Sequence, residues 1–597
     1  MAVKKVNVTI NGIEVQVPED YTVLLAAREA GIDIPTLCYL KDINEVAACR
    51  LCVCEAEVNG RPMRNLPTAC VLKVEDGMVV RTDTERVRKA VKMNLELLLA
   101  NHNRECLSCD RNQTCELQKL CHEMGVESTR FEGEMRSLCY DDLSPSIVRD
   151  SSKCVLCGRC VSACDKLQNI AVLEFVNRGV NTKVAPGFGY SIRDTDCIYC
   201  GQCINMCPVA AIKEKTHIPQ VWAAIQDPKK HVVVQTAPAV RAALGEEFGV
   251  KMGKAVTGKM VSALKRLGFD KVFDTNFSAD LTIMEEGYEF INRVKNNGTL
   301  PMITSCSPGW IRYCEEFYPE FIPNLSTCKS PQQMFGAVAK SYYAKKAGIK
   351  PKDIVCVSIM PCTAKKAECA RPEMQVDGHR DVDYVLTTRE LARIIREARI
   401  IFDKLPESNP DPILGEGSGA GVIFGATGGV MEAALRTVAD VLTGKDLKDI
   451  DYKAIRGIEN FKQASVKLPI GGKNVEVKVG VVSSIRAAEQ VLNQIEEGKL
   501  DLHFLEVMAC PGGCVHGGGQ PHVSAKDRID QEVRSERAKV LYSEDKRLPH
   551  RKSHENEEIK ALYEEYFKEP NSPISHKYLH TKYAEHFIYM PDVTDRV

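Results

Sequence analysis

The amino-acid sequence predicts a multidomain α+β protein in which small cysteine-rich units precede one large α/β domain. The chain has 597 residues, a length that predicts several domains. Its 26 cysteines include regularly spaced sets that all lie before residue 215. From residue 230 onward, strand-like and helix-like segments alternate, as in parallel sheets covered by helices. We place the predicted domain boundaries at 1–80, 81–140, 141–215 and 216–597.

Composition excludes several classes of protein. A formal net charge of -1 argues against a nucleic-acid binder, which would show a basic footprint. The first ten residues resemble a strand rather than a signal peptide, and no run of 18 apolar residues predicts a membrane helix. We therefore expect a cytoplasmic protein. Disulfides are rare in the cytosol, so spaced cysteines there indicate metal binding or catalysis.

The first unit, residues 1–80, begins with a hairpin pattern. Residues 4–17 alternate around Asn11-Gly12, a strong signal for a two-residue turn. A helix is predicted from Val23 to Ala30, with Gly31 ending it. A long loop with several cysteines follows.

Four thiols in this loop predict a metal site. Their spacing, C-x10-C-x2-C-x17-C, is close to the plant-type pattern of a [2Fe-2S] site, although zinc would also accept four thiolates. The hairpin, helix and long first loop resemble a β-grasp ferredoxin, which favours iron–sulfur. We interpret Cys54, on an apparent strand beside this set, as a packed thiol. The predicted ligands are Cys38, Cys49, Cys52 and Cys70.

The second unit, residues 81–140, combines an amphipathic helix with an incomplete thiol set. The helix spans 87–101 and has apolar residues on one face. Three cysteines cannot close a four-ligand site, so His102 is the favoured fourth ligand, and Cys121 competes with it. Spacing alone fits zinc as well as a [4Fe-4S] cubane. The three thiols are Cys106, Cys109 and Cys115.

The third unit, residues 141–215, has the least ambiguous motif. The pattern C-x2-C-x2-C-x3-C occurs twice, as in bacterial two-cluster ferredoxins, where each fourth cysteine ligates the other cluster. One predicted [4Fe-4S] set is Cys154, Cys157, Cys160 and Cys207. The second set is Cys197, Cys200, Cys203 and Cys164.

The large domain, residues 216–597, is expected to be an α/β domain with two parallel-sheet lobes. Strand-like segments at 232–234, 271–273 and 300–303 alternate with helix-like segments at 258–267 and 284–295. In open α/β sheets, sites form where the strands end. The polar tail from about Ser543 is interpreted as a solvated helix and wrap.

Three stretches of this domain are strands that stop at a thiol. They lead to Cys306, to Cys362, and to the pair Cys510 and Cys514, so all can converge on one buried point. The glycines at 517–519 follow the last pair, and glycine is used where something bulky comes close to the backbone. We therefore expect these glycines to leave room for a large inorganic group.

At these stretches the chain resembles the [FeFe]-hydrogenases, with the same units in the same order. The carrying motifs are Met360-Pro-Cys362-x2-Lys365-x2-Glu368 and Glu506-x-Met508-Ala-Cys510-x2-Gly513-Cys514-x2-Gly517-Gly-Gly519-x-Pro521. The resemblance implies an H-cluster, a [4Fe-4S] cubane joined through Cys514 to a two-iron unit carrying CO, CN⁻ and azadithiolate. It also implies cubane ligation by Cys362 and Cys510. With the upstream sites, we expect three further [4Fe-4S] clusters and one [2Fe-2S] cluster.

One position departs from the family pattern. The family has Thr-Ser-Cys-Cys-Pro-Gly-Trp, whereas this chain has Ser307 in place of the second, cubane-ligating cysteine. Cys306 aligns with the first cysteine, the proton relay. Our hypothesis is that Cys328 supplies the fourth cubane thiolate. The alternatives are ligation by Ser307 or by Cys306 itself.

The resemblance also implies a proton relay and a set of cluster contacts. Glu286 and Glu289 share a helix face, and by themselves would be read as solvated charges. In the family the matching glutamates and a serine, here Ser326, pass protons to Cys306. Arg293 is expected to pair with one glutamate at the outer end, and Lys365 to donate to a cyanide ligand. Further expected contacts of the cluster are Pro238, Gln332, Met360 and Met508.

The resulting hypothesis is a hydrogenase that interconverts two protons and two electrons with H2. The chain has no flavin or nicotinamide fingerprint, because Gly415-x-Gly417-x-Gly419 lacks the strand–helix context of such a motif. The electron partner would be a ferredoxin or flavin-containing NAD(P)H-oxidising subunits, and maturation proteins would build the two-iron unit. The alternative is a non-catalytic iron–sulfur subunit of an NADH-dehydrogenase-like complex, which would lack the three strand-end thiol stretches. Hydrogen sensors tend to lose the cysteine found here as Cys306, and cluster-assembly relatives lack the glycine-rich stretch.

Overall fold

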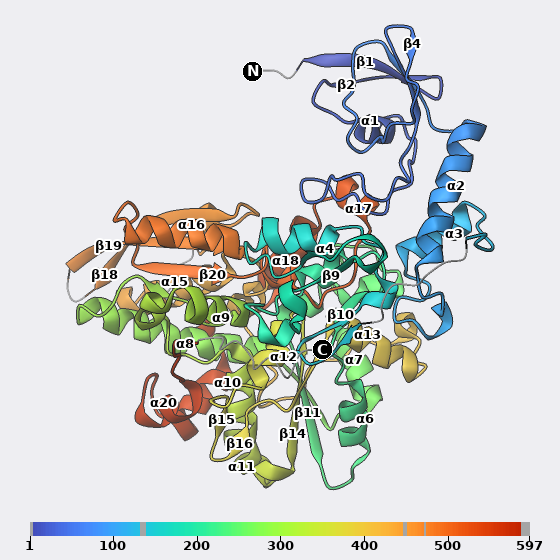
Figure 1. Cartoon of the computed structure of the whole chain (residues 1–597). Coiled ribbons are helices and arrows are strands. Elements are labelled where there is room, and N and C mark those ends of the chain that lie inside the picture. Colours follow the sequence, from blue (N-terminus) through green and yellow to red (C-terminus); the bar gives the residue numbers. More distant parts are fainter. Residues whose placement is uncertain (1–3, 132–138, 446–449, 471–472, 587–597) are drawn as a thin grey trace.

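The computed structural model describes residues 4–131, 139–445, 450–470 and 473–586. Figure 1 shows the N-terminal sheet standing apart from a large α/β body, with the cysteine-rich segments of residues 85–131 and 139–215 on the side that faces it. No helix within these described ranges has both the length and the apolar character needed to cross a membrane. The strands and helices below are those that carry or position the thiols.

The N-terminal unit is a five-stranded mixed sheet with the predicted hairpin. Strands β1 (Lys5–Ile10) and β2 (Ile13–Pro18) pair antiparallel around Asn11 and Gly12, which both have positive φ, as a tight turn requires. The sheet order is β2-β1-β5-β3-β4, with β5 parallel to β1 and antiparallel to β3. The remaining elements are β3 (Glu55–Val58), β4 (Arg61–Pro62), β5 (Met78–Arg81) and helix α1 (Val23–Glu29).

The next two units are small and tied together by short elements. Helix α2 (Glu85–Ala100) begins at Thr84, whose hydroxyl accepts from the Val87 amide, and buries Val87, Val91 and Leu95. A short sheet of order β10-β7-β6 then underlies the two cysteine repeats. The other elements are α3 (Glu116–Glu123), β6 (Tyr140–Asp141), β7 (Ile147–Asp150), α4 (Arg159–Ser162), β8 (Glu174–Val176), β9 (Lys183–Ala185), α5 (Gln202–Met206) and β10 (Ile212–Glu214).

The first lobe of the large domain is the parallel sheet that the alternating pattern predicted. Its order is β12-β11-β14-β17, and every pairing is parallel. Central residues such as Val232 to Val234 are fully buried, as expected for strands covered on both faces. The elements are α6 (Ile218–Gln226), β11 (His231–Thr236), α7 (Thr257–Leu267), β12 (Lys271–Asp274), α10 (Pro331–Val338), α11 (Ala344–Ala347), β14 (Ile354–Met360), α12 (Ala364–Cys369), β17 (Tyr384–Thr387) and α13 (Thr388–Glu397).

The second lobe is a mixed sheet, so the prediction of two parallel lobes is wrong here. Its order is β13-β20-β19-β18, and β18 returns antiparallel to β19 as one arm of a long hairpin. A hairpin needs no crossover helix, whereas a parallel strand does. The elements are β13 (Met302–Ile303), α9 (Pro308–Phe317), α14 (Gly419–Ile423), α15 (Gly429–Thr443), β18 (Phe461–Ile470), β19 (Lys473–Ser483), α16 (Ile485–Glu496) and β20 (Phe504–Met508).

Helix α8 (Thr275–Lys295) joins the two lobes. It is longer than the predicted segment 284–295 because its first turns are also helical, with Asp274 accepting from the Asn276 amide at the start. Phe277 and Leu281 belong to the core of the first lobe, whereas Ile283 and Phe290 belong to the core of the second. A helix that serves both cores fixes how the lobes face each other.

The C-terminal segment is packed, not solvated as predicted. Ile559, Leu562, Phe567 and Leu579 are almost fully buried in the core of the first lobe. Sequence composition missed this because the apolar residues are sparse among charged ones. The elements are α17 (Ala525–Asp530), α18 (Val533–Arg547), α19 (Glu557–Leu562) and α20 (Pro573–Leu579).

Candidate active site

The three strand-end thiol stretches meet at one cavity between the two lobes. Cys306 follows β13, Cys362 follows β14, and Cys510 and Cys514 follow β20. All four thiols line the same cavity. The carboxyl ends of strands from both sheets therefore supply thiols to one place, as site formation at strand ends requires.

The cavity wall is mostly apolar, with a few fixed polar groups. Pro238, Gln332, Met360 and Met508, all predicted as cluster contacts, line it. Lys365 also lines it, and its Nζ donates to the Cys306 carbonyl oxygen at 3.0 Å. A largely apolar cavity with few convergent polar groups is the usual construction of a cofactor site.

Glu368 holds two of these polar groups in place. Its carboxylate accepts from Lys365 Nζ at 3.0 and 3.1 Å and from Gln332 Nε2 at 2.9 Å. The carboxylate is almost fully buried, and Ser330 also donates to it. Glu368 thus orients Lys365 and Gln332 at the wall without lining the cavity itself.

Three of the thiols form a set that suits an iron–sulfur cluster. Burial raises the pKa of Cys514 to about 12, and it also raises the pKa of Cys362 and Cys510. Buried thiols held this way become thiolates only when a metal replaces the proton. The Cys510 thiol lies near both Cys362 and Cys514, since each raises its pKa electrostatically. The set fits the cubane that the resemblance implies.

Cys328, predicted as the fourth cubane ligand, does not line this cavity. Its sulfur instead lies 3.8 Å from Glu289 Oε2, and Cys328 is not among the residues that line the cavity. The geometry therefore contradicts this prediction, because a thiol turned away from the cavity cannot close the cluster. Ser307 and Cys306 both line the cavity, and the Ser307 hydroxyl accepts from the Ala509 amide, next to Cys510.

The predicted relay residues are arranged in a row leading outward from Cys306. Glu286 is 1% exposed and lies close enough to Cys306 to raise the pKa of that thiol. Burial, with the nearby Glu289 carboxylate second, raises the pKa of Glu286 to about 8, and the neighbouring Ser326 hydroxyl opposes this. Ser326 also donates to Glu289 Oε2 at 3.0 Å. The serine hydroxyl therefore stands between the two carboxyl groups.

Glu289 and Arg293 form the outer end of this row. Arg293 Nη2 donates to Glu289 Oε1 at 2.7 Å, and the two side chains are 14% and 12% exposed. Arg293 also donates to the carbonyl oxygens of Asn324 and Leu325, which fixes it against the loop that carries Ser326. The row runs from the buried cavity to the protein surface.

The glycines at 517–519 lie close to other parts of the protein. A Cβ on Gly517 would lie 2.2 Å from the Pro361 carbonyl oxygen, and one on Gly518 would lie 2.2 Å from the Cys200 carbonyl oxygen. A Cβ on Gly519 would lie 2.9 Å from the Thr387 side chain. Gly518 and Gly519 do not line the cavity, so at these two positions the close approach is to other parts of the protein. Gly517 does line the cavity, and the expected room for an inorganic group stays a prediction at that position.

Helix α5 of the two-repeat unit docks on this glycine segment. Gln202 Nε2 donates to the His516 carbonyl oxygen at 3.0 Å, and Asn205 Nδ2 donates to the Gly517 carbonyl oxygen at 2.9 Å. Arg389 donates to the Gly518 carbonyl oxygen at 2.7 Å and to Glu214 of the same unit at 2.8 Å. The contact brings Cys200 to the cavity wall, beside Cys510.

Gly518→Ala is expected to weaken this docking. The methyl group would meet backbone that has no room to move, a cost of about 1–3 kcal/mol for overpacking. Chemical unfolding monitored through the cluster absorption should show an earlier loss of the two-repeat unit. Gly187→Ala is the matched control, because its Cβ would meet only the mobile end of Glu174. Equal stability of the two variants would contradict the assigned role of Gly518.

The two predicted [4Fe-4S] sets each surround a cavity of their own. One cavity is lined by Cys154, Cys157, Cys160 and Cys207, and the other by Cys164, Cys197, Cys200 and Cys203. The last cysteine of each repeat therefore faces the thiols of the other repeat. This is the crossed arrangement that the spacing predicted.

The N-terminal thiols also gather. The Cys49 backbone amide donates to Cys38 Sγ at 3.5 Å, and the Cys52 and Cys70 thiols lie close enough together for Cys70 to raise the pKa of Cys52. Cys49 also acts electrostatically on Cys52, so the two pairs adjoin. The Cys54 thiol instead faces the Pro67 carbonyl oxygen, as expected for a packed thiol.

The His/Cys set is gathered less tightly. Cys106, Cys109 and Cys115 are partly exposed, and His102 is buried at the end of α2. Cys121 on α3 lies near Cys115 and Cys106, because both raise its pKa after burial. The choice of His102 over Cys121 stays a prediction.

Polar side chains that the sequence did not single out link these sites. Asn44 Nδ2 donates to the carbonyl oxygens of Cys38 at 2.7 Å and Cys157 at 3.0 Å, so it joins the N-terminal thiol loop to the two-repeat unit. Arg111 donates to the Cys207 carbonyl oxygen. Neither residue has a local sequence signal for this role, since the contacts with Cys157 and Cys207 each span about a hundred positions.

Glu506 is a further residue without a predicted role. It is fully buried in β20 and accepts from the amides of Gly428 and Met431, at 2.6 and 2.7 Å. Those amides belong to the start of α15, where a carboxylate is favoured by the helix dipole. A charged residue inside an apolar strand was the signal that could have revealed this anchor.

Comparisons with known proteins match the same regions. "Iron only hydrogenase large subunit, C-terminal domain" matches residues 230–518, and "Iron hydrogenase small subunit" matches residues 531–586. A 2Fe-2S binding domain matches 3–85, an NADH-ubiquinone oxidoreductase-G iron-sulfur binding region matches 92–130, and a 4Fe-4S dicluster domain matches 153–211.

Individual relatives cover nearly the whole chain. The NADP-reducing hydrogenase subunit HndD of Solidesulfovibrio fructosivorans is 48% identical, covering 96% of this chain and 98% of its own. Iron hydrogenase 1 of Clostridium pasteurianum is 45% identical, covering 97% of this chain and 100% of its own. A variant of the apo [FeFe]-hydrogenase HydA1 from Chlamydomonas reinhardtii is 41% identical, with a TM-score of 0.56 over 62% of this chain and 99% of that one.

These matches confirm the resemblance. The matches extend over the cysteine-rich units as well as the large domain. Because the large domain carries the hydrogenase match, they exclude the alternative of a non-catalytic iron–sulfur electron-transfer subunit. The chain belongs to the iron-only hydrogenase family.

Proposed function

We propose that this chain catalyses the reversible interconversion of H2 with two protons and two electrons. The observation that carries the proposal is the convergence of Cys306, Cys362, Cys510 and Cys514 on one apolar cavity that adjoins Cys200 of the two-repeat unit. A site of this kind joins a proton route and an electron route at one place.

Each residue of the cavity has a proposed role toward the H-cluster. Cys362, Cys510 and Cys514 would ligate the cubane, with Cys514 also joining it to the two-iron unit. Lys365 would donate to a cyanide ligand, and Pro238, Gln332, Met360 and Met508 would enclose the two-iron unit and exclude water. When bound, the H-cluster supplies the metal centre and the redox change for the chemistry of H2.

The fourth cubane corner is assigned to Ser307. Its hydroxyl lies beside Ala509 and lines the cavity, whereas Cys306 interacts with Glu286 on the relay side. Cys306 is thus kept for proton transfer. Hard oxygen ligation at one iron would also distinguish this cluster electronically from an all-thiolate one.

Iron content and the paramagnetic signal of the cubane distinguish Cys328 from Ser307 as the fourth cubane ligand. Cys328→Ala is expected to retain the iron content and cubane signal of the parent chain, since Cys328 faces away from the cavity. Ser307→Ala should alter the electron paramagnetic resonance signal of that cubane, while the four-thiolate clusters upstream keep theirs. Loss of the cubane in Cys328→Ala but not in Ser307→Ala would reverse the assignment.

The proton route is proposed to run from Cys306 through Glu286, Ser326 and Glu289, with Arg293 at the surface. Groups in a relay must lie within hydrogen-bond reach of one another. Ser326 meets this condition because it donates to Glu289 and interacts with Glu286. Arg293 would keep the Glu289 carboxylate oriented toward Ser326.

Electrons are proposed to travel through a branched chain of clusters. The five-stranded N-terminal unit, proposed to be a β-grasp domain, would hold the [2Fe-2S] cluster, and His102 with Cys106, Cys109 and Cys115 would hold a [4Fe-4S] cluster. Asn44 and Arg111 join both to the cluster of Cys154, Cys157, Cys160 and Cys207. From there the second cluster of the two-repeat unit leads to Cys510 through Cys200.

The proposed electron partner is a flavin-containing, NAD(P)-linked subunit, with ferredoxin as a second donor or acceptor. The support is the 48% identical relative, named as a subunit of an NADP-reducing hydrogenase. Purification from the source cell under native conditions would identify the partner. A chain that purifies alone and reacts only with ferredoxin would remove the flavoprotein option. A cytoplasmic location stays a prediction.

The direct test of the function is turnover by the matured protein. The chain expressed together with hydrogenase maturation proteins should oxidise H2 with a viologen dye and show infrared bands of CO and CN⁻. The proposed function would be disproved by an iron-replete, fully matured preparation that neither oxidises H2 nor shows these infrared bands.

A further inference from the structure

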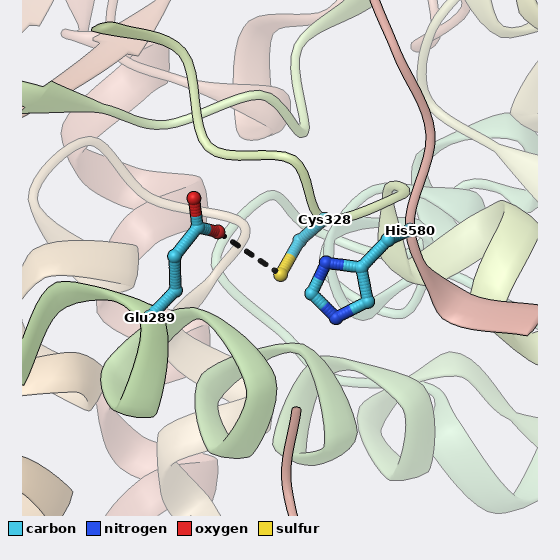
Figure 2. A group of neighbouring side chains, drawn as sticks. All are labelled: Glu289, Cys328 and His580. Carbon is cyan, nitrogen blue, oxygen red and sulfur yellow. Dashed lines mark hydrogen bonds between the residues drawn. The ribbon is translucent and has the colours of Figure 1, made fainter. Parts of the chain in front are cut away.

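Three side chains of different chemistry gather at the outer end of the proposed relay. Figure 2 shows the Cys328 sulfur between the Glu289 carboxylate and the His580 imidazole. One ligand atom from each lies within 4.8 Å of the other two. We propose that Glu289, Cys328 and His580 form a binding site for one Zn²⁺ ion, and that an ion bound there blocks the proton relay. The second part rests on the proposed function.

The ligand set suits zinc. Zinc binds thiolate sulfur, imidazole nitrogen and carboxylate oxygen, and three protein ligands leave a fourth position for water. Tetrahedral zinc with ordinary bond lengths separates sulfur and oxygen ligands by about 3.6 Å. The Cys328 Sγ to Glu289 Oε2 distance is 3.8 Å, so the ion requires little movement of these two atoms.

The fold holds the third ligand in a suitable orientation. His580 pairs through the backbone with Cys328, which fixes the C-terminal segment against the loop after Ser326. Its Nε2 lies 3.0 Å from Glu285 Oε2, so this nitrogen carries the proton and donates it to the carboxylate. Nδ1 then presents a lone pair, which meets the Thr327 hydroxyl at 2.8 Å. A ligating histidine commonly donates its other N–H to a carboxylate in this manner.

Glu285 is itself immobilised. It is fully buried and accepts from the Tyr563 hydroxyl at 2.6 Å, the Asn571 amide at 2.8 Å and the Ser575 hydroxyl at 3.2 Å. These partners come from the packed C-terminal segment. The orientation of the imidazole is therefore built into the core and does not depend on a surface side chain.

Charge and access also fit a divalent ion. Cys328 is fully buried, but Glu289 keeps 12% of its side chain exposed, so an ion can reach the site from the surface. On binding, the Cys328 thiol loses its proton to solvent and its sulfur bonds the metal. Thiolate and carboxylate then balance the two positive charges.

Zinc binding would affect the relay because the zinc ion would use the Glu289 carboxylate oxygen that takes part in the relay. Glu289 Oε2 is the atom nearest Cys328 and also the acceptor of the Ser326 hydroxyl, at 3.0 Å. A zinc ion on Oε2 would replace that hydrogen bond, whereas Oε1 would keep Arg293. Glu289 would then be unable to exchange a proton with Ser326.

The site is tested by metal analysis of the iron-loaded protein. The chain is equilibrated with zinc sulfate and desalted, and zinc per chain and the zinc K-edge X-ray absorption are measured. We expect one added zinc with one sulfur neighbour at about 2.3 Å and nitrogen or oxygen neighbours at about 2.0–2.2 Å. Cys328→Ala and His580→Gln should lose it, and Glu285→Gln should bind it about 10–100-fold more weakly.

The matched control is Cys356→Ala, which removes an equally buried thiol from β14. It should bind zinc as the parent chain does, and iron content verifies that every variant is folded and loaded. Zinc uptake that persists in both Cys328→Ala and His580→Gln, or an absorption spectrum without sulfur, would overturn the site.

Turnover measurements distinguish zinc binding at this site from the proposed block of the proton relay. Zinc should slow H2 oxidation by the parent chain and by Cys356→Ala, and the half-inhibiting concentration should rise at least about tenfold in Cys328→Ala. Zinc bound through sulfur without any slowing would overturn the block on the relay. If no chain turns over H2, the proposed function fails, and the zinc count alone still decides the site.

Discussion

Glu286→Gln is expected to slow H2 turnover by about 10²–10⁴-fold, the usual contribution of a positioned acid–base group. Glutamine has nearly the same shape but cannot take up and release a proton. Glu286 stands between Cys306 and Ser326 in this row, since it acts electrostatically on the Cys306 thiol and interacts with the Ser326 hydroxyl. Turnover would be measured with a viologen dye, and iron content would show whether the clusters are intact.

The pH dependence gives a second readout of the same residue. Burial and Glu289 raise the pKa of Glu286 to about 8, so the side chain is mostly protonated below that pH and mostly ionised above it. In the parent chain, H2 evolution should decline as the pH rises through about 8, because protonated Glu286 becomes scarce. The Gln variant should be slow at every pH and lack this decline.

Asp280→Asn is the control for loss of a buried carboxyl group from the same helix. Asp280 is fully buried and bonds to Ser418 and Asn556, away from the relay. It should keep most of the turnover of the parent chain. If Glu286→Gln and Asp280→Asn were equally active, Glu286 would not be part of the proton route.

Cys514→Ala should abolish turnover of H2 to the level of the uncatalysed background. This thiol is proposed to join the cubane to the two-iron unit, so its loss removes the only covalent link between the two. The infrared bands of CO and CN⁻ should disappear from matured protein. The clusters of the two-repeat unit and the N-terminal units should keep their paramagnetic signals, because their thiols line separate cavities.

Cys369→Ala is the matched control for this loss. Cys369 is a buried thiol on α12, and it donates to the Lys366 carbonyl oxygen. It should retain both the infrared bands and the turnover. Bands of undiminished intensity in Cys514→Ala would mean that another residue holds the two-iron unit.

The cysteine spacings were informative because cluster ligands are mostly local. In the two-repeat unit, three of the four thiols around each cavity come from one short motif, and the fourth comes from the other repeat. The strand-end thiols were also informative, because a strand that stops at a cysteine places it at the edge of a sheet. Neither conclusion needs the distance between remote segments.

The sequence-based predictions failed where the position of a residue depends on a contact with a residue far away in the sequence. The sequence suggested Cys328 as a ligand because it is an extra thiol near the cavity motifs, but the loop turns it toward Glu289 and His580. Likewise, the glycines at 517–519 suggested space for a cofactor, yet Gly518 allows the backbone of Cys200 to come close. Both errors come from reading a residue type without knowing its neighbour.

By itself the sequence determined the order of the units, the thiols available to each site and the family to which the chain belongs, because these depend on local spacing and long motifs. Only the tertiary structure decided which thiol faces the central cavity, how helix α5 docks on the glycine segment, and how His580 comes to lie beside Glu289. These depend on contacts between positions that are hundreds of residues apart. Such contacts are set by the packing of the two lobes and the C-terminal segment around helix α8, which no local pattern encodes.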